Sequence, residues 1–271
     1  MSALYELEEV GRSFRQGEQT IEAVDTVTAT IAPGELVAIT GASGSGKTTL
    51  LQLLGGLERP TRGRIRFEDA DLSDLSDEQL TTLRSRAFGF VFQQFNLIPT
   101  LSSRENIEAA LAPVRSDRAD RRRHAGELLE RVGLGDRADH LPGQLSGGQQ
   151  QRVAIARALA NGPRVILADE PTGNLDARTS EEIAGLLTGL AGDGTAVVLV
   201  THDARLAERA PRVVELRDGR IVGERAGDGR PGTAIDADGR LTLPQDLRDR
   251  WSGRRVGVED HGSHLVVRAD T

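Results

Sequence analysis

The chain has 271 residues, 38% of them hydrophobic and 28% charged, with a formal net charge of −7 at neutral pH. This composition is typical of a globular protein with one sizeable core and a small additional part, and its acidic balance argues against general nucleic-acid binding. No apolar run reaches the roughly 18 residues of a membrane span, the acidic start from Met1 to Val10 does not fit a signal peptide, and the absence of cysteine excludes disulfides and thiolate metal sites.

A phosphate-binding loop is predicted near the start of the chain. Glu35 to Thr40, ELVAIT, is typical of a buried strand, and it runs through GASGSGKT, Gly41 to Thr48, into the helical TLLQLL, Thr49 to Leu54. A strand, a glycine-rich loop and a helix in this order predict a P-loop. Its glycines allow a sharp turn with backbone N–H groups aimed at an anion, which the helix N-terminus also attracts.

The side chains of this loop complete a nucleotide site. Lys47 is expected to reach the β- and γ-phosphates and Thr48 to bind Mg²⁺. A glycine-rich turn without a ligand is the alternative, against which the flanking strand and helix argue. The residues expected around the nucleotide here are Gly41, Ser43, Gly44, Ser45, Gly46, Lys47, Thr48 and Thr49.

The next segments raise the question of a partner surface. Phe95 to Leu101, FNLIPTL, is unusually apolar for a connection. If these side chains are exposed they predict a surface that needs a partner, and if they are buried they belong to the core. The stretch from Ser116 to Val132 is predicted to be a charged helix. Its run RRRH, Arg121 to His124, is interpreted as a solvated face because acidic residues surround it.

A second anion-binding helix start is predicted at LSGGQQQR, Leu145 to Arg152. Ser146 is a favourable N-cap, and Gly147 and Gly148 leave the N–H groups of the helix uncovered, so that an anion can approach. A capped helix without a ligand is the alternative. The helix itself is supported by apolar residues at helical spacing and by a Gly-Pro stop, namely Ile155, Ala156, Leu159, Ala160 and Gly162-Pro163.

Two carboxylates end the next predicted strand, RVILADEP, Arg164 to Pro171. Its apolar run indicates an internal strand, and ligands bind at strand ends in open α/β sheets. We therefore expect Asp169 to bind Mg²⁺ and Glu170 to activate the attacking water. A solvated pair of carboxylates in a loop is the alternative. A further apolar strand, AVVLV from Ala196 to Val200, is followed by His202.

From about Leu4 to Val222 the chain resembles the ATP-binding cassette (ABC) ATPases. The resemblance rests on motifs in the order of the family: GASGSGKT, FVFQQ (Phe90 to Gln94), LSGGQ, ILADEP, NLD (Asn174 to Asp176) and VTHD (Val200 to Asp203). It implies an α/β P-loop NTPase fold with a RecA-like core, an antiparallel β subdomain and a helical subdomain. It also implies hydrolysis of ATP with Mg²⁺ as cofactor.

The resemblance assigns further roles residue by residue. It implies that Phe14 stacks on adenine, where many relatives have tyrosine; packing into local β-structure is the alternative. It implies that Gln93 touches Mg²⁺ and water and that His202 contacts the γ-phosphate. Without the resemblance, the first would be interpreted as a surface glutamine and the second as a hydrogen-bonded loop histidine.

A second copy of the chain is the first implied partner. In the family, the signature residues face the ATP of the other subunit, and these are Ser146, Gly147, Gly148 and Gln149 here. Asp176 would lie at the dimer seam. The resemblance therefore implies a homodimer with two ATPs between the subunits.

A membrane permease is the second implied partner. Gly89 to Ile107, GFVFQQFNLIPTLSSRENI, is similar to the lipoprotein-release, macrolide-export and cell-division group (LolD/MacB/FtsE-like). This implies a separate permease that docks near Gln93 to Leu101 and holds the chain at the cytoplasmic face of the membrane, with export or extraction of a lipophilic or peptide-like substrate. The alternative is a soluble or mechanotransmitting ABC ATPase with a nucleic-acid-binding or regulatory tail.

Three parts are expected: residues 1–222 as the ATPase, 223–232 as a linker, and 233–271 as a β-rich module. In the last part we expect a strand, a turn at Asp238-Gly239, another strand, a helix from Pro244 and two final strands in RRVGVED and SHLVVRAD. This pattern resembles AbrB-like swapped-hairpin modules. Its 39 residues are too few for a core of their own, so it is expected to pair with another copy or pack on the ATPase. Six arginines against seven acids argue against DNA binding.

Overall fold

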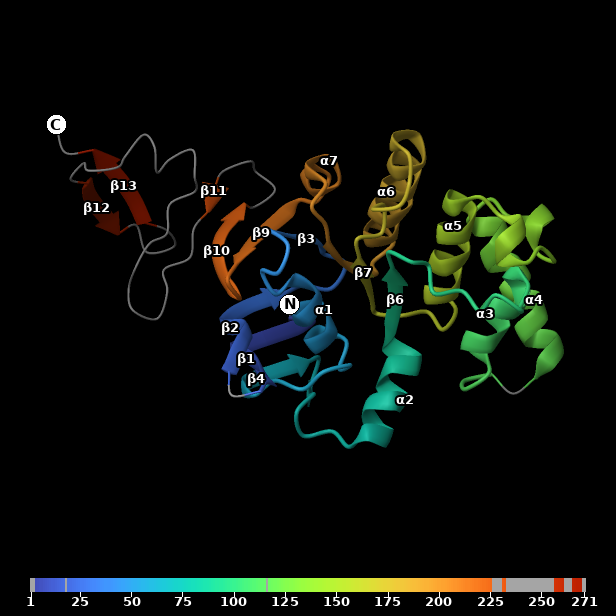
Figure 1. Cartoon of the computed structure of the whole chain (residues 1–271), viewed down its shortest axis with the longest axis horizontal. Helices are drawn as coiled ribbons and strands as arrows, with labels where there is room; N and C mark the ends of the chain where they lie inside the picture. Colours follow the sequence, from blue (N-terminus) through green and yellow to red (C-terminus); the bar gives the residue numbers. More distant parts are fainter. Residues whose placement is uncertain are drawn as a thin grey trace.

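The computed structural model describes residues 3–17, 19–115, 117–225, 231–232, 256–260 and 265–269. Within them, two large sheets and a set of helices form an α/β architecture (Figure 1). One sheet has the strand order β2-β1-β4-β5, and the other has the order β11-β10-β9-β3-β8-β7-β6. The predicted α/β fold with an antiparallel β part and a helical part is therefore confirmed.

The central sheet contains the strands that position the site. Five neighbouring strands run parallel, and two antiparallel strands extend one edge. The strands predicted from ELVAIT, RVILADEP and AVVLV are all present. The parallel strands are β3 (Leu36–Thr40), β6 (Phe88–Phe92), β7 (Val165–Asp169), β8 (Ala196–Val200) and β9 (Arg212–Arg217); the antiparallel ones are β10 (Arg220–Arg225) and β11 (Pro231–Gly232).

Both faces of the inner strands β3, β7 and β8 are buried, which explains why these strands are almost entirely apolar. Successive side chains of a strand point to opposite faces. In β7, Val165 and Leu167 join one buried cluster, whereas Ile166 and Ala168 join the other. The first cluster, here the α1-side cluster, also contains the leucines of α1 (Lys47–Leu54). The second, the helical-side cluster, contains apolar residues of the helices on the other face.

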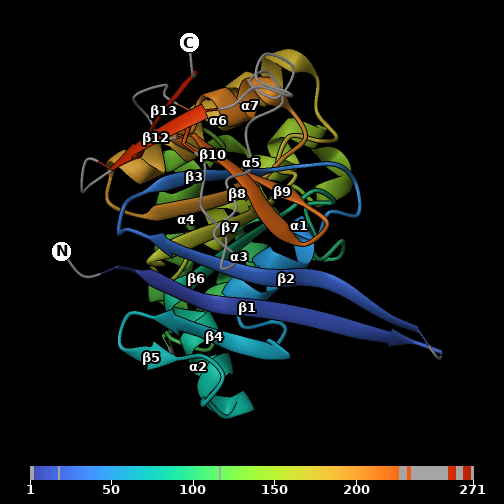
Figure 2. The same cartoon turned by 90° about the vertical axis from the view of Figure 1, so that its left-hand side faces the viewer.

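The antiparallel sheet covers the α1-side cluster. It consists of β1 (Tyr5–Gln16), β2 (Gln19–Ile31), β4 (Arg62–Phe67) and β5 (Ala70–Asp71), and Figure 2 shows β1 and β2 side by side next to the central sheet. Tyr5 and Phe67 pack edge to face with their ring centroids 4.9 Å apart. The Tyr5 hydroxyl donates a hydrogen bond to the Leu54 carbonyl at 2.9 Å, which ties this sheet to the end of α1.

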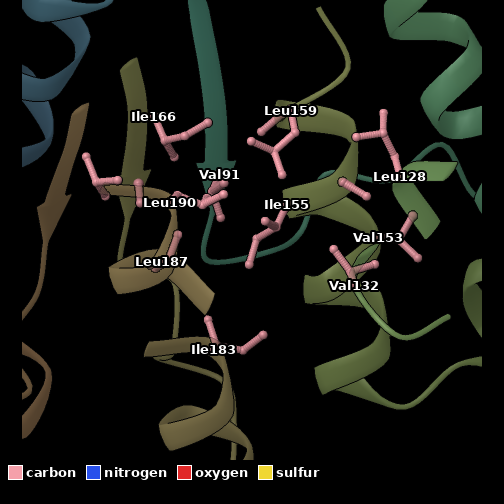
Figure 3. Close-up of a cluster of buried hydrophobic side chains, with 14 of the residues drawn as sticks. Val91, Leu128, Val132, Val153, Ile155, Leu159, Ile166, Ile183, Leu187 and Leu190 are labelled. Carbon is pink, nitrogen blue, oxygen red and sulfur yellow. The ribbon is translucent and has the colours of Figure 1, made fainter. Parts of the chain in front are cut away.

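The helical-side cluster joins the remaining helices to the sheet. In Figure 3, Ile155 of α5, Leu187 of α6 and Val91 of β6 converge in it. The predicted charged helix and the helix at LSGGQQQR are both present as α4 and α5. The helices are α2 (Asp77–Ala87), α3 (Ser103–Leu111), α4 (Arg118–Arg131), α5 (Gly147–Ala158), α6 (Ala177–Gly192) and α7 (Ala204–Glu208), with short 3-10 turns η1 (Gly135–Arg137) and η2 (Pro142–Gln144).

The apolar loop FNLIPTL is divided between core and surface. Leu97 packs against the helical-side cluster, whereas 45% of Ile98 is exposed. Both interpretations of this loop therefore hold, each for part of it. In the charged helix α4, Arg123 pairs with Asp120 and Glu127 one turn away on either side, which agrees with a solvated face.

At the C-terminal end, β10 continues to Arg225, so three residues of the expected linker belong to this strand. The two last expected strands are present as β12 (Val256–Asp260) and β13 (Leu265–Ala269), which pair antiparallel in a sheet of their own. The earlier strands, the Asp238-Gly239 turn and the helix from Pro244 lie outside the described residues. Among the described helices, none has the length and apolarity to cross a membrane.

Candidate nucleotide-binding site

The P-loop lies between the end of β3 and the start of α1. Gly46 is the N-cap of α1 with φ 97°, and a Cβ there would lie 1.9 Å from the Ala23 carbonyl oxygen. Gly41 has φ 146°, and its Cβ would lie 2.1 Å from the Leu216 oxygen. Only glycine fits these two positions. No side chain caps α1, as far as the described residues show. The first N–H groups of this helix are thus suited to bind an anion.

Lys47 and Thr48 begin α1 and point toward the loop and toward β7. The Lys47 ammonium donates to the carbonyl oxygens of Gly41 and Ala42, both at 2.8 Å, and only 8% of this charged residue is exposed. The Thr48 hydroxyl donates to Asp169 Oδ1 at 3.3 Å. The Lys47 ammonium, the Thr48 hydroxyl and the Asp169 carboxylate therefore lie close together at the start of α1, as the sequence predicts for a phosphate and magnesium site.

Electrostatics at Asp169 favour a cation beside it. Burial raises the pKa of the Asp169 carboxyl above its ordinary value, and the charge of Glu170 raises it further. The hydrogen bond from Thr48 and the charge of Lys47 oppose this shift. A bound divalent cation would stabilise the carboxylate form, because an opposite charge nearby favours ionisation.

Glu170 and His202 lie within hydrogen-bonding distance of each other, just beyond the ends of β7 and β8. Glu170 Oε1 lies 2.9 Å from His202 Nδ1, and the backbone N–H of His202 donates to Glu170 Oε2 at 3.3 Å. The Glu170 side chain is only 16% exposed, whereas that of His202 is 70% exposed. Glu170 has φ 46°, a left-handed conformation that costs free energy in a non-glycine residue. Such outliers concentrate at functional sites.

One cavity of about 700 Å³ is lined by all three predicted catalytic residues and by most of the predicted P-loop residues. Gln93 joins it from the end of β6, where its backbone oxygen accepts a hydrogen bond from Asn174 Nδ2 at 3.0 Å. Gly41 and the buried Ser45 belong to the same loop but not to the lining, and Asp169 is linked to the cavity through its hydrogen bond with Thr48. The residues lining the cavity are Ala23, Ser43, Gly44, Gly46, Lys47, Thr48, Thr49, Gln93, Glu170, Val200 and His202.

Phe14 lies on β1 outside the lining of this cavity. It is opposite Ile21 in the β1–β2 pairing, and β2 continues to Ala23, which does line the cavity. The Arg12 guanidinium lies 4.6 Å from the centroid of the Phe14 ring. With 37% of Phe14 exposed, the aromatic residue is not a fully packed core residue.

The signature residues are also absent from that cavity lining. Ser146 and Gln149 form a reciprocal capping box at the start of α5, so the predicted N-cap is confirmed. A Cβ on Gly148 would lie 2.2 Å from Thr179 Cγ2. Thr179 in turn donates to Asp176, the N-cap of α6, and these hydrogen bonds lower the pKa of the Asp176 carboxyl. The signature and the predicted seam residue are neighbours in one chain.

Sequence reasoning missed several residues of this region. Asn174 holds Gln93, and only its place in the NLD motif marked it beforehand. Ala23 carries no recognisable signal at all. Gln151 lies in the quoted LSGGQQQR stretch without an assigned role, yet it is fully buried and bound to the Pro171 carbonyl.

Comparison with known proteins settles the class. The family model described as ABC transporter matches residues 24–173. The chain belongs to this family, and it is an ATP-binding cassette with ATPase activity.

Particular relatives place it more closely. The chain is 49% identical over 250 residues to the macrolide export ATP-binding/permease protein MacB of Rhodopseudomonas palustris. This match covers 92% of this chain and 38% of that protein. It is 50% identical over 221 residues to MacB of Azoarcus sp., covering 82% of this chain and 34% of that protein. The chain therefore spans well under half the length of these relatives, and it fits the lipoprotein-release, macrolide-export and cell-division group.

Solved structures of ATP-binding cassettes are similar to this chain in fold and in sequence. The ATP-binding cassette MJ0796, a dimer in a post-hydrolysis state bound to ADP and Pi, is 45% identical with a TM-score of 0.78, covering 83% of this chain and 100% of that one. The cbiO1 protein of Clostridium perfringens, part of the transporter complex cbiONQ, is 28% identical with a TM-score of 0.75, covering 84% of this chain and 90% of that one.

Proposed function

We propose that this chain is the ATPase subunit of an exporter, in which two copies close over two ATPs and drive a separate membrane permease. One observation carries this proposal. The chain has both a P-loop cavity and a signature helix, but the signature residues do not line that cavity. A second copy would supply the missing half of each site. The dimeric state of MJ0796 supports the same arrangement.

In this proposal the P-loop holds the phosphates. Lys47 exchanges its two carbonyl partners for the β- and γ-phosphates. The N–H groups at the start of α1 bind the same phosphates. Phe14 stacks on adenine with the ring face that Arg12 leaves free. Ser146, Gly147, Gly148 and Gln149 approach the γ-phosphate from the partner copy, with Asp176 at the seam.

The residues beside Thr48 fit Mg²⁺. The hydroxyl of Thr48, the carboxylate of Asp169 and the amide oxygen of Gln93 are oxygen donors, which Mg²⁺ prefers, and burial disfavours the Asp169 carboxylate without a cation. Bound Mg²⁺ supplies charge neutralisation on the phosphates. Glu170 orients and deprotonates the attacking water, and His202, held by Glu170, contacts the γ-phosphate. Catalysis is then mainly positioning and charge stabilisation.

A separate groove of about 490 Å³ suits the permease. It is lined by residues of α2, β6 and the end of α5, and it includes Asn96 of the loop after Gln93. No acidic side chain is among its described lining residues, although the chain as a whole is acidic. The apolar lining residues are Leu57, Phe88, Phe90, Phe92, Ala110 and Ala158, and the two cationic ones are Arg84 and Arg157.

The two arginines specify the chemistry of the occupant. Arg157 donates to the backbone oxygens of Phe95 and Asn96, and burial lowers its pKa. Arg84 donates to the Gly56 oxygen and the Thr81 hydroxyl. Neither arginine has a carboxylate partner within the described part of the chain. A short permease helix with an apolar face and a carboxylate would therefore complement this groove.

Sedimentation of the Glu170→Gln variant tests the dimer. With saturating Mg-ATP the variant is expected to sediment as a dimer, because it binds but does not consume the nucleotide. Without nucleotide, or with ADP, the dimer should be weaker. A strictly monomeric variant under saturating Mg-ATP would contradict the proposal.

Co-purification from membranes tests the docking groove. Leu57→Asp places a charge in the groove at a residue that is 47% exposed, and Leu141→Asp is a matched control outside it at 42% exposed. The first variant should lose the permease and the second should keep it. If both variants retain the permease equally, the permease does not dock in this groove.

We also propose that residues 233–271 form a module that pairs with the same module of a second copy. Among the described residues, the β12–β13 sheet consists of two strands, and an isolated pair of strands is marginally stable in water. Deleting Thr233 to Thr271 should weaken nucleotide-free dimerisation in sedimentation experiments. An unchanged association constant would reject this role.

A further inference from the structure

Gln151 is a buried amide whose hydrogen bonding is half complete. It lies on α5, five residues after Ser146, and has no exposed surface. Its Nε2 donates to the Pro171 carbonyl at 2.7 Å, whereas its Oε1 is buried without a hydrogen-bond partner among the described residues. A buried unpartnered oxygen has a free-energy cost, which the single hydrogen bond to Pro171 offsets only in part. Stability alone therefore does not account for this amide.

Pro171 is the residue through which Gln151 reaches the catalytic loop. It follows Glu170, and because proline has no N–H, its carbonyl is its one backbone hydrogen-bonding group. Glu170 sits at φ 46° before this buried proline, so its backbone has little freedom of its own. The hydrogen bond from Gln151 therefore holds the backbone at the residue directly after Glu170.

The same loop contacts the signature a second time. Cβ atoms on Gly147 and Gly148 would lie 3.4 Å from Leu175 and 2.2 Å from Thr179, respectively. The glycines thus let the signature backbone pack closely against these two side chains, and because glycine has no side chain, this packing includes no directional side-chain bond from either glycine. The hydrogen bond from Gln151 to Pro171 is directional and short. It is thus a directional contact that joins the signature helix directly to the residue after Glu170.

We propose that Gln151 is a positioning residue that couples the two ATP sites of the dimer, a role that rests on the proposed dimeric function. In that dimer the signature of a chain serves the ATP of its partner, whereas Glu170 serves the ATP of its own chain. Gln151 joins these two elements within one chain. Closure of one site pulls α5, and through Pro171 it orients Glu170 in the other site.

Gln151→Met tests this coupling, with Gln150→Met as the matched control. Methionine retains the length of glutamine but cannot donate to Pro171, and Gln150 donates to the Leu145 carbonyl on the same helix instead. ATPase rate is measured against ATP concentration for the full chain, and nucleotide affinity is measured with a fluorescent ATP analogue. Each variant is also placed in the Glu170→Gln background for sedimentation with Mg-ATP.

We expect Gln151→Met to lower kcat about tenfold, since small misplacements of a catalytic group cost up to about 10²-fold. The Hill coefficient should fall from about 2, the number of sites, to about 1. Nucleotide affinity should stay within about twofold. The double variant with Glu170→Gln should still dimerise with Mg-ATP, because the P-loop and the signature are intact. Gln150→Met should keep the wild-type Hill coefficient.

Two results would overturn the coupling while leaving the dimer in place: a wild-type Hill coefficient and kcat in Gln151→Met, or losses of affinity and melting temperature that parallel the loss of kcat. The first excludes a role for the amide, and the second reduces it to folding. If Glu170→Gln stays monomeric with Mg-ATP, and the unsubstituted chain hydrolyses ATP with a Hill coefficient of 1, both the dimer and the coupling are overturned.

Discussion

The two glycines in the middle of the P-loop give a sharp test of its geometry. Gly44 and Gly46 both have positive φ, 80° and 97°, so alanine is strained at either position. They differ in their surroundings. A Cβ at position 44 meets no atom within 4 Å, whereas a Cβ at position 46 would lie 1.9 Å from the Ala23 carbonyl oxygen and 3.6 Å from Gly219 Cα. The pair therefore separates backbone strain from steric overlap.

The magnitudes follow from these distances. Left-handed backbone costs a residue with a Cβ about 1–2 kcal/mol, which is the full effect expected for Gly44→Ala. Gly46→Ala adds an overlap with backbone that no rotamer change relieves, and overpacking of this kind costs about 1–3 kcal/mol more. We expect unfolding free energies lower by about 1–2 kcal/mol for the first variant and about 2–5 kcal/mol for the second.

Equilibrium unfolding in urea, without nucleotide, measures both values. A direct titration with ATP should show at least a roughly tenfold weaker affinity for Gly46→Ala, because the first N–H groups of α1 are displaced from the phosphates. Equal destabilisation by the two substitutions would refute the description of the Ala23 contact.

Three further predictions concern the chemistry of the site. Glu170→Gln should lower ATP turnover about 10²–10⁴-fold while ATP affinity stays within about twofold, as steady-state assays and nucleotide titration would show; unchanged turnover would remove Glu170 from the mechanism. Phe14→Ala should weaken ATP binding by about 1–3 kcal/mol and Phe14→Tyr should preserve it, since base stacking needs only the ring; calorimetry measures both, and equal affinities would exclude stacking. Because the folded pKa of Asp169 is raised, the folded state binds the proton more tightly than the unfolded state, so wild-type stability should fall as pH rises from the unfolded pKa through the folded one. Asp169→Asn should lack this fall in metal-free unfolding experiments, and an identical pH profile would contradict the assignment.

Contiguous features of the sequence predicted most of the site. The P-loop, the capped helix at Ser146 and the carboxylates after β7 each occupy one short stretch, where periodicity, glycine and capping residues report directly on local structure. The overall fold followed from the resemblance of these motifs to the ABC ATPases, whereas the apolar runs by themselves indicate only internal strands.

Contacts between distant stretches were beyond such reasoning. Nothing local to Asn174 indicates that it holds Gln93. Helical spacing places Gln151 on the face of Ile155 and Leu159, but it does not indicate the bond to Pro171. The turn at Gly219 is another example, because its N–H donates to the Ser45 carbonyl and supports the P-loop from the opposite end of the chain. These pairings depend on tertiary packing, which single-residue patterns do not encode.

Complementation between two inactive variants tests most directly whether each site is shared by two copies. Lys47→Ala disables the P-loop and Ser146→Arg disables the signature, so each variant alone should have almost no ATPase activity. If the sites are shared, a 1:1 mixture should regain up to about one quarter of wild-type activity, because half of the randomly formed dimers are mixed and each has one complete site. A mixture as inactive as its two components, although mixed dimers form, would contradict the account.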